Sequence, residues 1–291
     1  MAKARKTPRL PPPEEQSSGP MTKARKTPRV RLDQALVDAG LAPSRSRAQA
    51  MILAGGVLLD GELVTRASHP VPEGASLALR AQDHGFASRG GVKLAGALDH
   101  FAWDPKGLVV LDVGASTGGF TDCLLQRGAL HVIALDVGYG QLAWALRQDP
   151  RVTVLERTNI RQATLELLLG AGPPPPPRPP DAAVVDVSFI SLTLVLPVLL
   201  SLLPPRAPVV ALIKPQFEAG RGEVGKGGVV RDPEVRARAI GRVVEACQGL
   251  GCEVRGTVPS SLPGPKGNLE ELILFLCPAS SDAHGSTGVQ P

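Results

Sequence analysis

Residues 108–120, which read LVVLDVGASTGGF, constrain the fold of this chain more than any other stretch. The first four are apolar and partly β-branched, as expected of a strand that is buried on both faces. Asp112 is expected at the end of this strand, and the glycines that follow turn the chain into a helical run at 120–126. A second strand, 131–135, ends in another acid, Asp136. An acid about 20 residues past a glycine turn is where nucleotide-binding α/β folds hold ribose hydroxyls.

The glycine turn does not have the spacing of a dinucleotide site. The pattern G-x-G-x-x-G requires glycine where this chain has Ser116, and that glycine serves the approach of a pyrophosphate. A leading acid suits a ligand with positive charge and no phosphate, such as S-adenosylmethionine with its sulfonium and amino groups. An ordinary strand–turn–helix without a ligand is the alternative. Six residues are expected at this cofactor: Asp112, Gly114, Ser116 and Gly118 beside its methionine part, Asp136 on its ribose hydroxyls, and Asn159 near its adenine.

The charge of the chain is concentrated at its start. The 291 residues carry a net charge of +5, and residues 1–30 alone hold eight Lys or Arg against two Glu, which leaves the remainder near −1. A basic end of this kind indicates attraction to nucleic acid or simple solvation. The motif KARKTPR occurs at 3–9 and again at 23–29, around a Pro-, Glu- and Ser-rich segment. We therefore predict that 1–29 is a disordered basic tail, with Met21 as a second candidate start.

Composition argues against several classes of protein. The four cysteines lack C-x-x-C spacing, which disfavours zinc and disulfide frameworks, and no metal site is predicted. The most apolar run, 192–203, is shorter than the roughly 20 residues that a membrane span needs. No apolar segment follows the basic N-terminus, so it does not read as a secretion signal. We expect a cytoplasmic protein without a membrane partner, and the oligomeric state stays open.

Residues 30–80 are expected to form a small α+β module. The pattern of apolar residues and glycine turns predicts helices at 31–40 and 45–53 and strands at 57–59, 63–65 and 75–80. The strings R-L-D-x-x-L, S-R-x-x-A and G-x-V-x-x-D-G in this module resemble the S4-like RNA-binding domain. The resemblance implies that RNA docks on the helix pair, with Arg31, Arg45 and Arg47 as phosphate contacts. A solvated helix face is the alternative. Aromatic residues are scarce here, which favours recognition of RNA shape and backbone.

After a linker at 81–87, residues 88–278 alternate expected strands and helices, and a disordered tail at 279–291 closes the chain. The expected strands are 108–112, 131–136, 152–156, 182–186, 209–213, 253–258 and 272–276. A helix is expected at 232–249, with Asp232 as its cap and Pro233 in its first turn. The alternation predicts an α/β domain with a mostly parallel, doubly wound sheet of seven strands. The proline-rich segment 173–180 is expected to be an exposed spacer loop.

Polar residues stand at the ends of several expected strands. Asp186 and Lys214 end the fourth and fifth strands, Glu270 precedes the last strand, and Lys93 lies in SRGGVKL ahead of the sheet. Ligands of such folds bind outside the carboxyl ends of the strands, where the strand order reverses. With the strings SRGGVKL, DVGASTGGF, DVSFISL, KPQFE and GNLE, these residues resemble the FtsJ/TlyA group of ribose 2′-O-methyltransferases, which have a Rossmann-like class I methyltransferase domain.

The resemblance covers residues 30–278 and implies a function as well as a fold. It implies a catalytic tetrad at Lys93, Asp186, Lys214 and Glu270. It also implies methyl transfer from S-adenosylmethionine to cytidine 2′-hydroxyls, with ribosomal RNA or ribosomal subunits as the partner. Arg89, within SRGGVKL, is counted with the RNA contacts.

The residue types of the tetrad suit this chemistry. A ribose 2′-hydroxyl is a weak nucleophile and must lose its proton as it attacks the methyl group. A lysine can act as the base only when its pKa is lowered, and a second lysine nearby lowers it by like-charge repulsion. We expect Lys214 to be the base and Lys93 to tune it and to steady the developing alkoxide. Asp186 is expected to orient Lys214 and the methyl donor, and Glu270 to position Lys93 or the ribose. Which lysine is the base stays open.

Other functions compete with this one. A base methyltransferase that acts on exocyclic amines would need Asn-Pro-Pro-Tyr, which the chain lacks. A membrane-lysing hemolysin, suggested by the family's historical name, would need a span or a lytic amphipathic helix. A non-enzymatic RNA-binding or ribosome-assembly factor that retains the cofactor fold would leave the tetrad unexplained. The Gly-rich, charged residues 217–228 are expected to be a mobile lid over RNA or a plain flexible loop.

Overall fold

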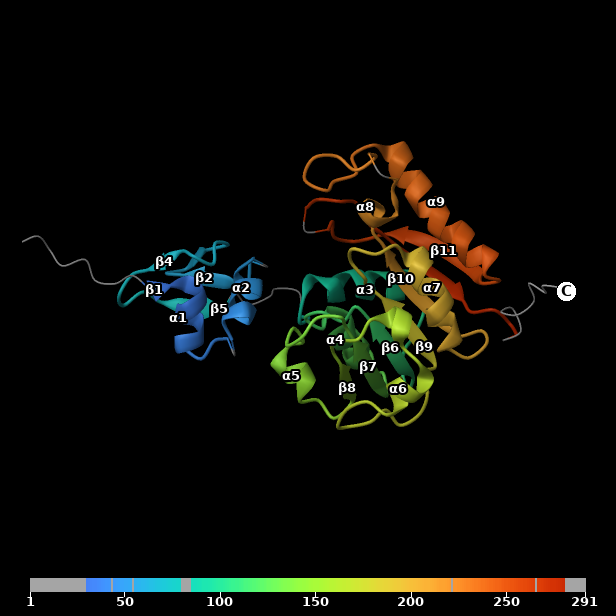
Figure 1. Ribbon diagram of the computed structural model, residues 1–291, viewed down its shortest axis with the longest axis horizontal. Helices are drawn as coiled ribbons and strands as arrows, with labels where there is room; N and C mark the ends of the chain where they lie inside the picture. The colour runs from blue at the N-terminus through green and yellow to red at the C-terminus, as the bar shows by residue number, and fades with distance from the viewer. Residues whose placement is uncertain are drawn as a thin grey trace, which may run out of the picture. The chain divides into compact units, whose positions relative to one another are not determined.

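The computed structural model describes residues 30–42, 44–53, 55–79, 85–220, 222–264 and 266–280. The predicted tail at 1–29, residues 81–84 of the predicted linker, and residues 281–291 of the predicted C-terminal tail lie outside the described residues. The chain divides into two compact units at the boundary between residues 80 and 81, and each unit is described by itself (Figure 1).

The first unit combines two helices with a small antiparallel sheet. The helices are α1 (Leu32–Asp38) and α2 (Arg45–Leu53). The central strand β2 (Val57–Leu59) pairs with β3 (Glu62–Leu63) and β5 (Leu77–Leu79). The core of the unit consists of buried apolar side chains from the helices and β2, among them Leu32, Leu36, Ile52 and Val57.

Local sequence predicts one feature of this unit, a hairpin turn, but not another, a short strand pairing. Asp60 and Gly61 join β2 and β3 with φ values of +51° and +84°, as a two-residue hairpin turn of type I′ requires. A second ladder pairs β1 (Val30–Arg31) with β4 (Pro70–Val71). This ladder was not predicted, because strands of two residues are too short to show alternation.

A seven-stranded sheet runs through the second unit and confirms the predicted fold class. The strands lie in the order β11-β12-β10-β9-β6-β7-β8. Their bounds, each within one residue of the prediction, are β6 (Val109–Val113), β7 (His131–Leu135), β8 (Val152–Leu155), β9 (Ala182–Val185), β10 (Pro208–Ile213), β11 (Glu253–Pro259) and β12 (Glu271–Leu276). Strand β12 is antiparallel to β10 and β11, and the other neighbouring strands are parallel. The strand order reverses between β6 and β9, which is where a ligand is expected.

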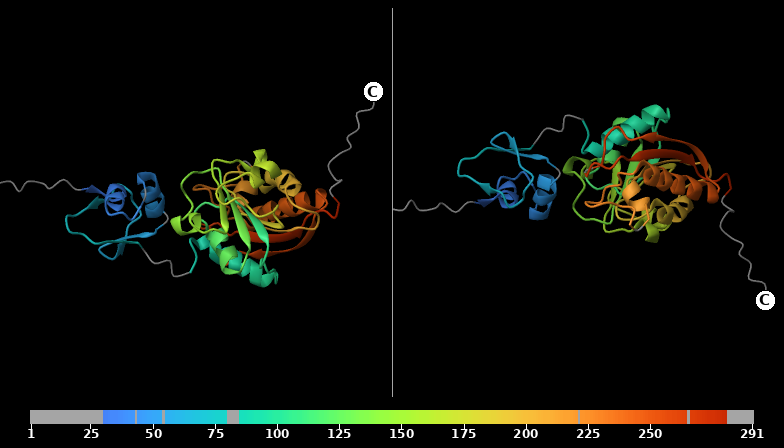
Figure 2. Two further views of the ribbon diagram at one scale, coloured as in Figure 1. Left: turned by 90° about the horizontal axis from the view of Figure 1, so that it is seen from below. Right: turned by 90° about the horizontal axis from the view of Figure 1, so that it is seen from above.

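Helices cover both faces of this sheet, and each face has its own hydrophobic core (Figure 2). Because side chains alternate along a strand, Val109 and Leu111 belong to one core and Val110 to the other. The first face carries α6 (Leu165–Leu169), α7 (Leu192–Ser201) and α9 (Pro233–Gly249), and the second carries α3 (Arg89–His100) and α4 (Gly119–Gln126). Three short helices complete the unit: α5 (Trp144–Arg147), η1 (Ile160–Gln162) and α8 (Pro215–Glu218).

The proline-rich insertion forms a loop that is only partly exposed. Residues 173–180 contain no helix or strand, but Pro176 and Pro180 are buried. The Thr153 hydroxyl donates a hydrogen bond to the Pro174 carbonyl oxygen at 2.6 Å, which fastens the loop to β8. The segment is therefore held against the sheet rather than extended into solvent as a free spacer.

Two glycines set the position of α3. Gly91 lies in the first turn of α3 and Gly119 begins α4. A Cβ on Gly91 would come within 2.9 Å of the Gly119 carbonyl oxygen, and one on Gly119 within 2.9 Å of the Gly91 amide nitrogen. No larger residue can occupy either position without moving a helix. The paired glycines of SRGGVKL and STGGF thus allow the close crossing that brings Lys93 to the edge of the sheet.

Gly91→Ala is expected to destabilise the protein by roughly 1–3 kcal/mol, because the added methyl group would clash with the Gly119 carbonyl and the Phe86 ring. Gly241→Ala, in the middle of α9, is the matched control. Nothing lies within 4 Å of its Cβ position. The gain in helix propensity, roughly 0.5–1 kcal/mol, should therefore remain. Urea denaturation followed by circular dichroism measures both, and equal effects of the two substitutions would contradict the close crossing.

Candidate active site

Strand register brings three of the four predicted tetrad residues to one edge of the sheet. Asp186 directly follows β9 and Lys214 directly follows β10, so both stand at the carboxyl ends of parallel strands. Glu270 directly precedes β12, which runs in the opposite direction, and Ile213 pairs with Glu271. One step further along this antiparallel register, Lys214 lies opposite Glu270.

The Lys214 ammonium group contacts Asp186 and Ser188. Its Nζ lies 2.6 Å from Asp186 Oδ1 and donates a hydrogen bond to Ser188 Oγ at 2.9 Å. The side chains of Lys214 and Asp186 are 12% and 25% exposed, so this ion pair is open to solvent on one side. A molecule bound at the edge of the sheet can therefore reach it.

The fourth residue, Lys93, is held in a deeper pair with Glu270. Its Nζ donates to Glu270 Oε2 at 2.5 Å, and the two side chains are only 8% and 1% exposed. Gly264 packs against the other oxygen of Glu270, where a Cβ would overlap Oε1. Because a buried ammonium group is costly without a partner, Glu270 fixes both the charge and the place of Lys93.

Four buried side-chain oxygens near this edge receive no hydrogen bond within the described part of the chain. They are Oδ1 of Asp112, Oδ1 of Asp186, Oε1 of Gln216 and Oε1 of Glu270. The contact between Asp186 Oδ1 and Lys214 is close enough for an ion pair, but its geometry is not that of a hydrogen bond. Buried polar atoms are normally satisfied by protein or by ordered water, so these oxygens can accept hydrogen bonds from solvent or from a bound molecule.

The glycine turn lies beside Asp186, where the strand order reverses. Gly114 has a φ of +88°, and a Cβ there would come within 2.5 Å of the Asp186 carbonyl oxygen. Gly118 has a φ of +94°, and a Cβ there would overlap the Leu146 side chain. Ser116, between them, also has a positive φ of +49°. Only glycine fits at the first and last of these positions, so packing fixes the path of the turn.

Asp136 links the glycine turn to the end of β7. Its Oδ2 accepts a hydrogen bond from the Ser116 amide at 2.8 Å, and its Oδ1 accepts one from the Gly138 amide at 2.6 Å. Each carboxylate oxygen has a second lone pair that stays available to a hydroxyl donor. The geometry therefore suits a diol such as the ribose 2′,3′-hydroxyls.

Asp112 lies deeper than the sequence predicted. Strand β6 extends to Val113, which still pairs with Leu135, so Asp112 is inside the strand and fully buried. The prediction that Asp112 ends the strand is wrong by one residue. Thr121 Oγ1 donates to Asp112 Oδ2 at 2.6 Å. Burial raises the pKa of the Asp112 carboxyl to about 7, the neighbouring Asp186 charge adds to the rise, and the Thr121 hydrogen bond opposes it.

Two other predicted site residues have local structural partners. Asn159 caps η1, because its Oδ1 accepts a hydrogen bond from the Arg161 amide at 3.0 Å. A contact of Asn159 with adenine stays a prediction. Arg89 begins α3 and is exposed, and its Nη2 lies 3.5 Å from the Pro263 carbonyl oxygen.

In the first unit, a buried acid organises two of the predicted RNA-binding arginines. Asp33 is fully buried and accepts hydrogen bonds from Arg31 Nε and Nη2 at 3.0 and 2.9 Å, Arg45 Nε at 3.0 Å and Gln49 Nε2 at 2.7 Å. The bonds from Arg31 contribute most to lowering the pKa of Asp33. The Arg31 and Arg45 side chains are 47% and 51% exposed. Each guanidinium is thus held along one edge and open to solvent along the other. Arg47, the third predicted contact, lies in the first turn of α2.

Sequence reasoning did not assign a role to the residues just after Asp186. Ser188 bonds Lys214, as described above. Phe189 is 92% exposed, has a φ of +66°, and lies with its ring centroid 5.3 Å from that of Phe217. A large aromatic residue that is both exposed and held at positive φ marks a surface for contact. Ser188 and Phe189 both belong to the string DVSFISL. The string alone does not distinguish Phe189 from a core phenylalanine; its exposure and backbone conformation do.

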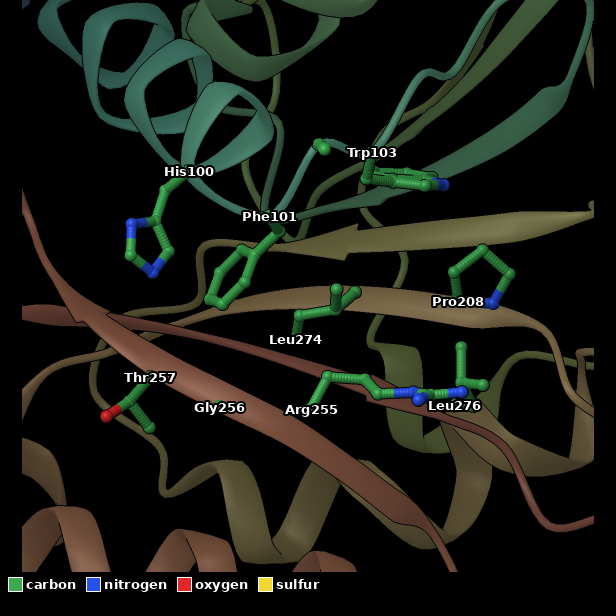
Figure 3. Close-up of a pocket in the computed structure, with 10 residues that line it drawn as sticks. His100, Phe101, Trp103, Pro208, Arg255, Gly256, Thr257, Leu274 and Leu276 are labelled. Atoms are coloured by element: carbon green, nitrogen blue, oxygen red, sulfur yellow. The ribbon is translucent and has the colours of Figure 1, made fainter.

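The surface has a hollow near each end of the central strands. One of about 250 Å³ reaches Glu270 and is also lined by Arg236, Pro263 and Leu269. Another, of about 540 Å³, is lined by the end of α3 and by β10, β11 and β12, with Phe101 facing the strands (Figure 3). The start of β10 and the end of β12 line it, so it lies at the opposite edge of the sheet from Lys214.

Two features are absent from the described residues. No helix among them is long and apolar enough to cross a membrane. They also contain no group of three or more His, Cys, Asp or Glu side chains arranged to hold a metal ion.

Comparison with known proteins places this geometry in a family. The second unit matches FtsJ-like methyltransferases over residues 86–276, and the first matches the S4 domain over residues 30–77. The chain is 49% identical to the 16S/23S rRNA (cytidine-2′-O)-methyltransferase TlyA of Mycobacterium tuberculosis, over 84% of this chain and 89% of that protein. The chain belongs to the TlyA family of FtsJ-like methyltransferases.

Other TlyA relatives carry a different name. The chain is 39% identical to Hemolysin A of Brachyspira hyodysenteriae, over 85% of this chain and 100% of that protein. A solved structure from Streptococcus thermophilus, provisionally assigned as a hemolysin, has a TM-score of 0.67 at 38% identity and covers 87% of this chain and 90% of its own. The resemblance to the TlyA family drawn from the sequence strings is confirmed.

The buried carboxyl of Asp112 predicts an unusual dependence of stability on pH. Its pKa is higher in the folded protein than in the unfolded chain, so the folded state keeps a proton that the unfolded state releases between about pH 4 and 7. Stability should therefore fall as pH rises through this window, by as much as roughly 4 kcal/mol, and level off above pH of about 7. In Asp112→Asn this fall should disappear. Urea denaturation at pH 5, 6, 7 and 8 measures the difference.

The same carboxyl offers an internal check. Thr121→Val removes the hydrogen bond that opposes the rise in the pKa of Asp112. The pH window of falling stability should then extend to higher pH than in the wild type. Parallel pH profiles of the wild type and Asp112→Asn would contradict the burial of an ionisable group at this position.

Proposed function

We propose that this protein transfers the methyl group of S-adenosylmethionine to a ribose 2′-hydroxyl of ribosomal RNA, with a cytidine as the acceptor. The observation that carries the proposal is the presence of two lysine–carboxylate pairs at the carboxyl edge of the sheet, beside the glycine turn. The Mycobacterium tuberculosis relative is named for this reaction, and 49% identity supports the same chemistry here. A protein that modifies ribosomal RNA works where ribosomes are, so we place it in the cytoplasm.

The residues around the glycine turn fit S-adenosylmethionine. The unpartnered Oδ1 of Asp112 lies buried behind the turn, where a cation in front of it would favour the ionised carboxylate. Gly114 and Gly118 have no side chains, so a ligand can approach the backbone of the turn closely, and Ser116 lies between them. Asp136 has lone pairs for the ribose hydroxyls. When bound, the cofactor supplies an electrophilic methyl group at this edge of the sheet.

Lys214 is the group best placed to take the proton from the acceptor hydroxyl. It is the more exposed of the two lysines, and Asp186 and Ser188 hold its Nζ in place. In its neutral form Lys214 accepts the 2′-hydroxyl proton as the ribose oxygen attacks the methyl group. Because the lysine is open to solvent on one side, it can then release that proton to water.

Glu270 holds the Lys93 ammonium group in place as a fixed, buried positive charge. The same fixed charge stabilises the negative charge that develops on the ribose oxygen as its proton leaves. The tetrad thus separates into a solvent-facing pair that moves a proton and a buried pair that supplies a constant field.

The two units offer complementary contacts to RNA. In the first unit, Asp33 fixes Arg31 and Arg45 so that the free edges of both guanidinium groups can hold backbone phosphates. In the second, the exposed ring of Phe189 beside Phe217 offers a face on which a base turned out of its stack can rest. Phosphate contacts supply affinity, and the aromatic face positions the acceptor nucleotide.

Transfer of radiolabelled methyl groups from S-adenosylmethionine to isolated 30S and 50S subunits, followed by alkaline hydrolysis, tests the function. Alkali cleaves RNA through a free 2′-hydroxyl, so the label should appear in resistant dinucleotides. Lys214→Ala should lower the rate about 10²–10⁴-fold, because the base is lost, while cofactor binding stays near the wild-type value. Lys106→Ala, which removes an exposed lysine beside Asp104, should have the wild-type rate.

Each of the other outcomes would point to a different function or to a different catalytic residue. Label in single nucleotides would move the chemistry from ribose to base. Absence of label on every subunit, with cofactor still bound, would favour a non-enzymatic RNA-binding or ribosome-assembly factor. Turnover retained in Lys214→Ala would refute the assignment of the base and leave the ribose chemistry in place.

Arg45→Ala should weaken binding to a ribosomal RNA fragment about tenfold and reduce the slope of log K against log salt by about 0.9, because one phosphate contact is lost. Arg45→Lys keeps the charge but loses the planar fork, so its affinity should be intermediate. Arg206→Ala in the second unit, which removes an equal charge paired with Glu253, is the control. An equal salt slope in the wild type and Arg45→Ala would show that the helix pair does not hold a phosphate.

A further inference from the structure

The glycine-rich segment that follows Lys214 contains a tight turn held by backbone hydrogen bonds. The Gly225 amide donates to the Val229 carbonyl at 3.1 Å, and the Gly228 amide donates to the Gly225 carbonyl at 3.0 Å. Gly227 and Gly228 have φ values of +85° and +78°, which glycine adopts without strain. Lys226 is thereby held at the exposed tip of a tight turn, residues 225–228. The prediction of a mobile lid or plain loop did not include this internal structure.

Three cationic side chains converge on this turn. Lys226 belongs to it, the Nη1 atom of Arg231 lies 3.7 Å from the Cβ position of Gly225, and the Nζ atom of Lys266 lies 3.6 Å from that of Gly228. None of the ion pairs within the described residues involves these three cations. The turn therefore presents a local excess of positive charge to solvent.

The acid nearest to the turn along the chain is already engaged on its other side. Glu223 Oε1 accepts a hydrogen bond from Arg238 Nη2 at 2.8 Å, and its Oε2 accepts one from the Gly220 amide at 2.7 Å. These bonds fasten the first half of the glycine-rich segment to α9. They also leave Lys226, Arg231 and Lys266 free to bind an anion.

A single buried amide fastens the second half of the segment to the active site. Asn268 is 2% exposed; its Oδ1 accepts the Val230 amide at 2.9 Å, and its Nδ2 donates to the Gly228 carbonyl at 2.8 Å. Its main-chain carbonyl accepts the Gly264 amide at 2.8 Å. Asn268 thus ties the cationic turn to residues 264–270, the segment that ends in Glu270.

Gly264 completes the connection to the tetrad. It packs directly against Oε1 of Glu270, and Oε2 of the same carboxylate holds Lys93. Because Glu270 is only two residues from Asn268 and is confined by Gly264, a displacement of the turn moves the buried ion pair. The turn and the pair are thus connected through the hydrogen bonds of Asn268 and the packing of Gly264 against Glu270.

We propose that the turn 225–228, with Lys226, Arg231 and Lys266, binds a backbone phosphate of the RNA strand next to the acceptor nucleotide, and that Asn268 is the positioning residue that couples this contact to the Lys93–Glu270 pair. The inference rests on the proposed function, since the substrate it assumes is RNA. Lys and Arg side chains around a glycine turn, where the backbone can approach a ligand closely, suit a phosphate group. Residues 225–231 contain no aromatic side chain on which a base could stack.

Steady-state methyl transfer to ribosomal subunits at several salt concentrations tests the proposal in the full-length protein. Lys226→Ala should raise KM about threefold to tenfold and reduce the salt dependence of log KM by about one unit of slope, because one phosphate contact is lost. Asn268→Ala should raise KM and also lower kcat about tenfold, since Glu270 loses its register with the turn. Adding Lys226→Ala to Asn268→Ala should raise KM less than it does in the wild type.

Amide hydrogen exchange over residues 222–231 gives a readout that does not depend on turnover. A ribosomal RNA fragment should slow exchange of this segment in the wild type, and Asn268→Ala should speed it in the free protein, because the Val230 amide loses its acceptor. Asn268→Asp, which keeps an acceptor for Val230, should have intermediate KM, kcat and exchange. Cofactor binding and the unfolding midpoint of each variant establish that it is folded.

The outcomes separate this proposal from the proposed function. An unchanged salt slope in Lys226→Ala, or wild-type KM and kcat in Asn268→Ala, would overturn the inference while methyl transfer stands. An equal effect of Lys106→Ala, the same charge removed elsewhere, would also overturn it. Absence of methyl transfer by the wild type, with RNA still protecting residues 222–231, would refute the proposed function and support the phosphate contact.

Discussion

Burying an ammonium group is costly unless a carboxylate lies beside it, and the Lys93–Glu270 pair imposes this requirement on the second unit. To meet it, α3 must cross α4 closely, which the glycines at positions 91 and 119 allow. Strand β12 must also run antiparallel to β10. Its direction places Glu270, which precedes it, at the edge where the parallel strands end. A parallel last strand would carry the same glutamate to the opposite edge of the sheet and leave Lys93 without a partner.

The arrangement of charge at this edge serves binding more than folding. Replacing a buried ion pair by apolar residues is often neutral or stabilising, so stability alone does not explain the pair. Buried oxygens of Asp112, Gln216 and Glu270 at or near the same edge accept no hydrogen bond from the described residues, and a buried oxygen without a donor costs free energy. A ligand that supplies donors or positive charge recovers that free energy on binding.

Sequence patterns predicted the fold closely and the site in part, for physical reasons. In the second unit the strand ends came within one residue, because apolar runs and glycine turns are local signals, whereas two of the short strands of the first unit differ from the prediction by two residues at one end. Asp112 shows the limit of that accuracy: a shift of one residue moves it from an exposed strand end into the core. Asp33, Phe189 and Asn268 were not assigned roles, although all lie in quoted strings. Their roles depend on burial, backbone conformation and partners from distant segments, such as the Val230 amide, which no local pattern encodes.

The distribution of charge argues that recognition of RNA depends on fixed geometry more than on net attraction. Outside residues 1–30 the chain is nearly neutral, so long-range attraction from the two folded units is weak. In the first unit, Asp33 offsets part of the charge of Arg31 and Arg45 but holds both guanidinium groups in place. In the second, Glu223 engages Arg238 on one side of the glycine-rich segment while cations stay unpaired at its turn. Carboxylates that fix basic residues lower non-specific affinity and define where a phosphate can lie, which an enzyme that modifies selected nucleotides requires.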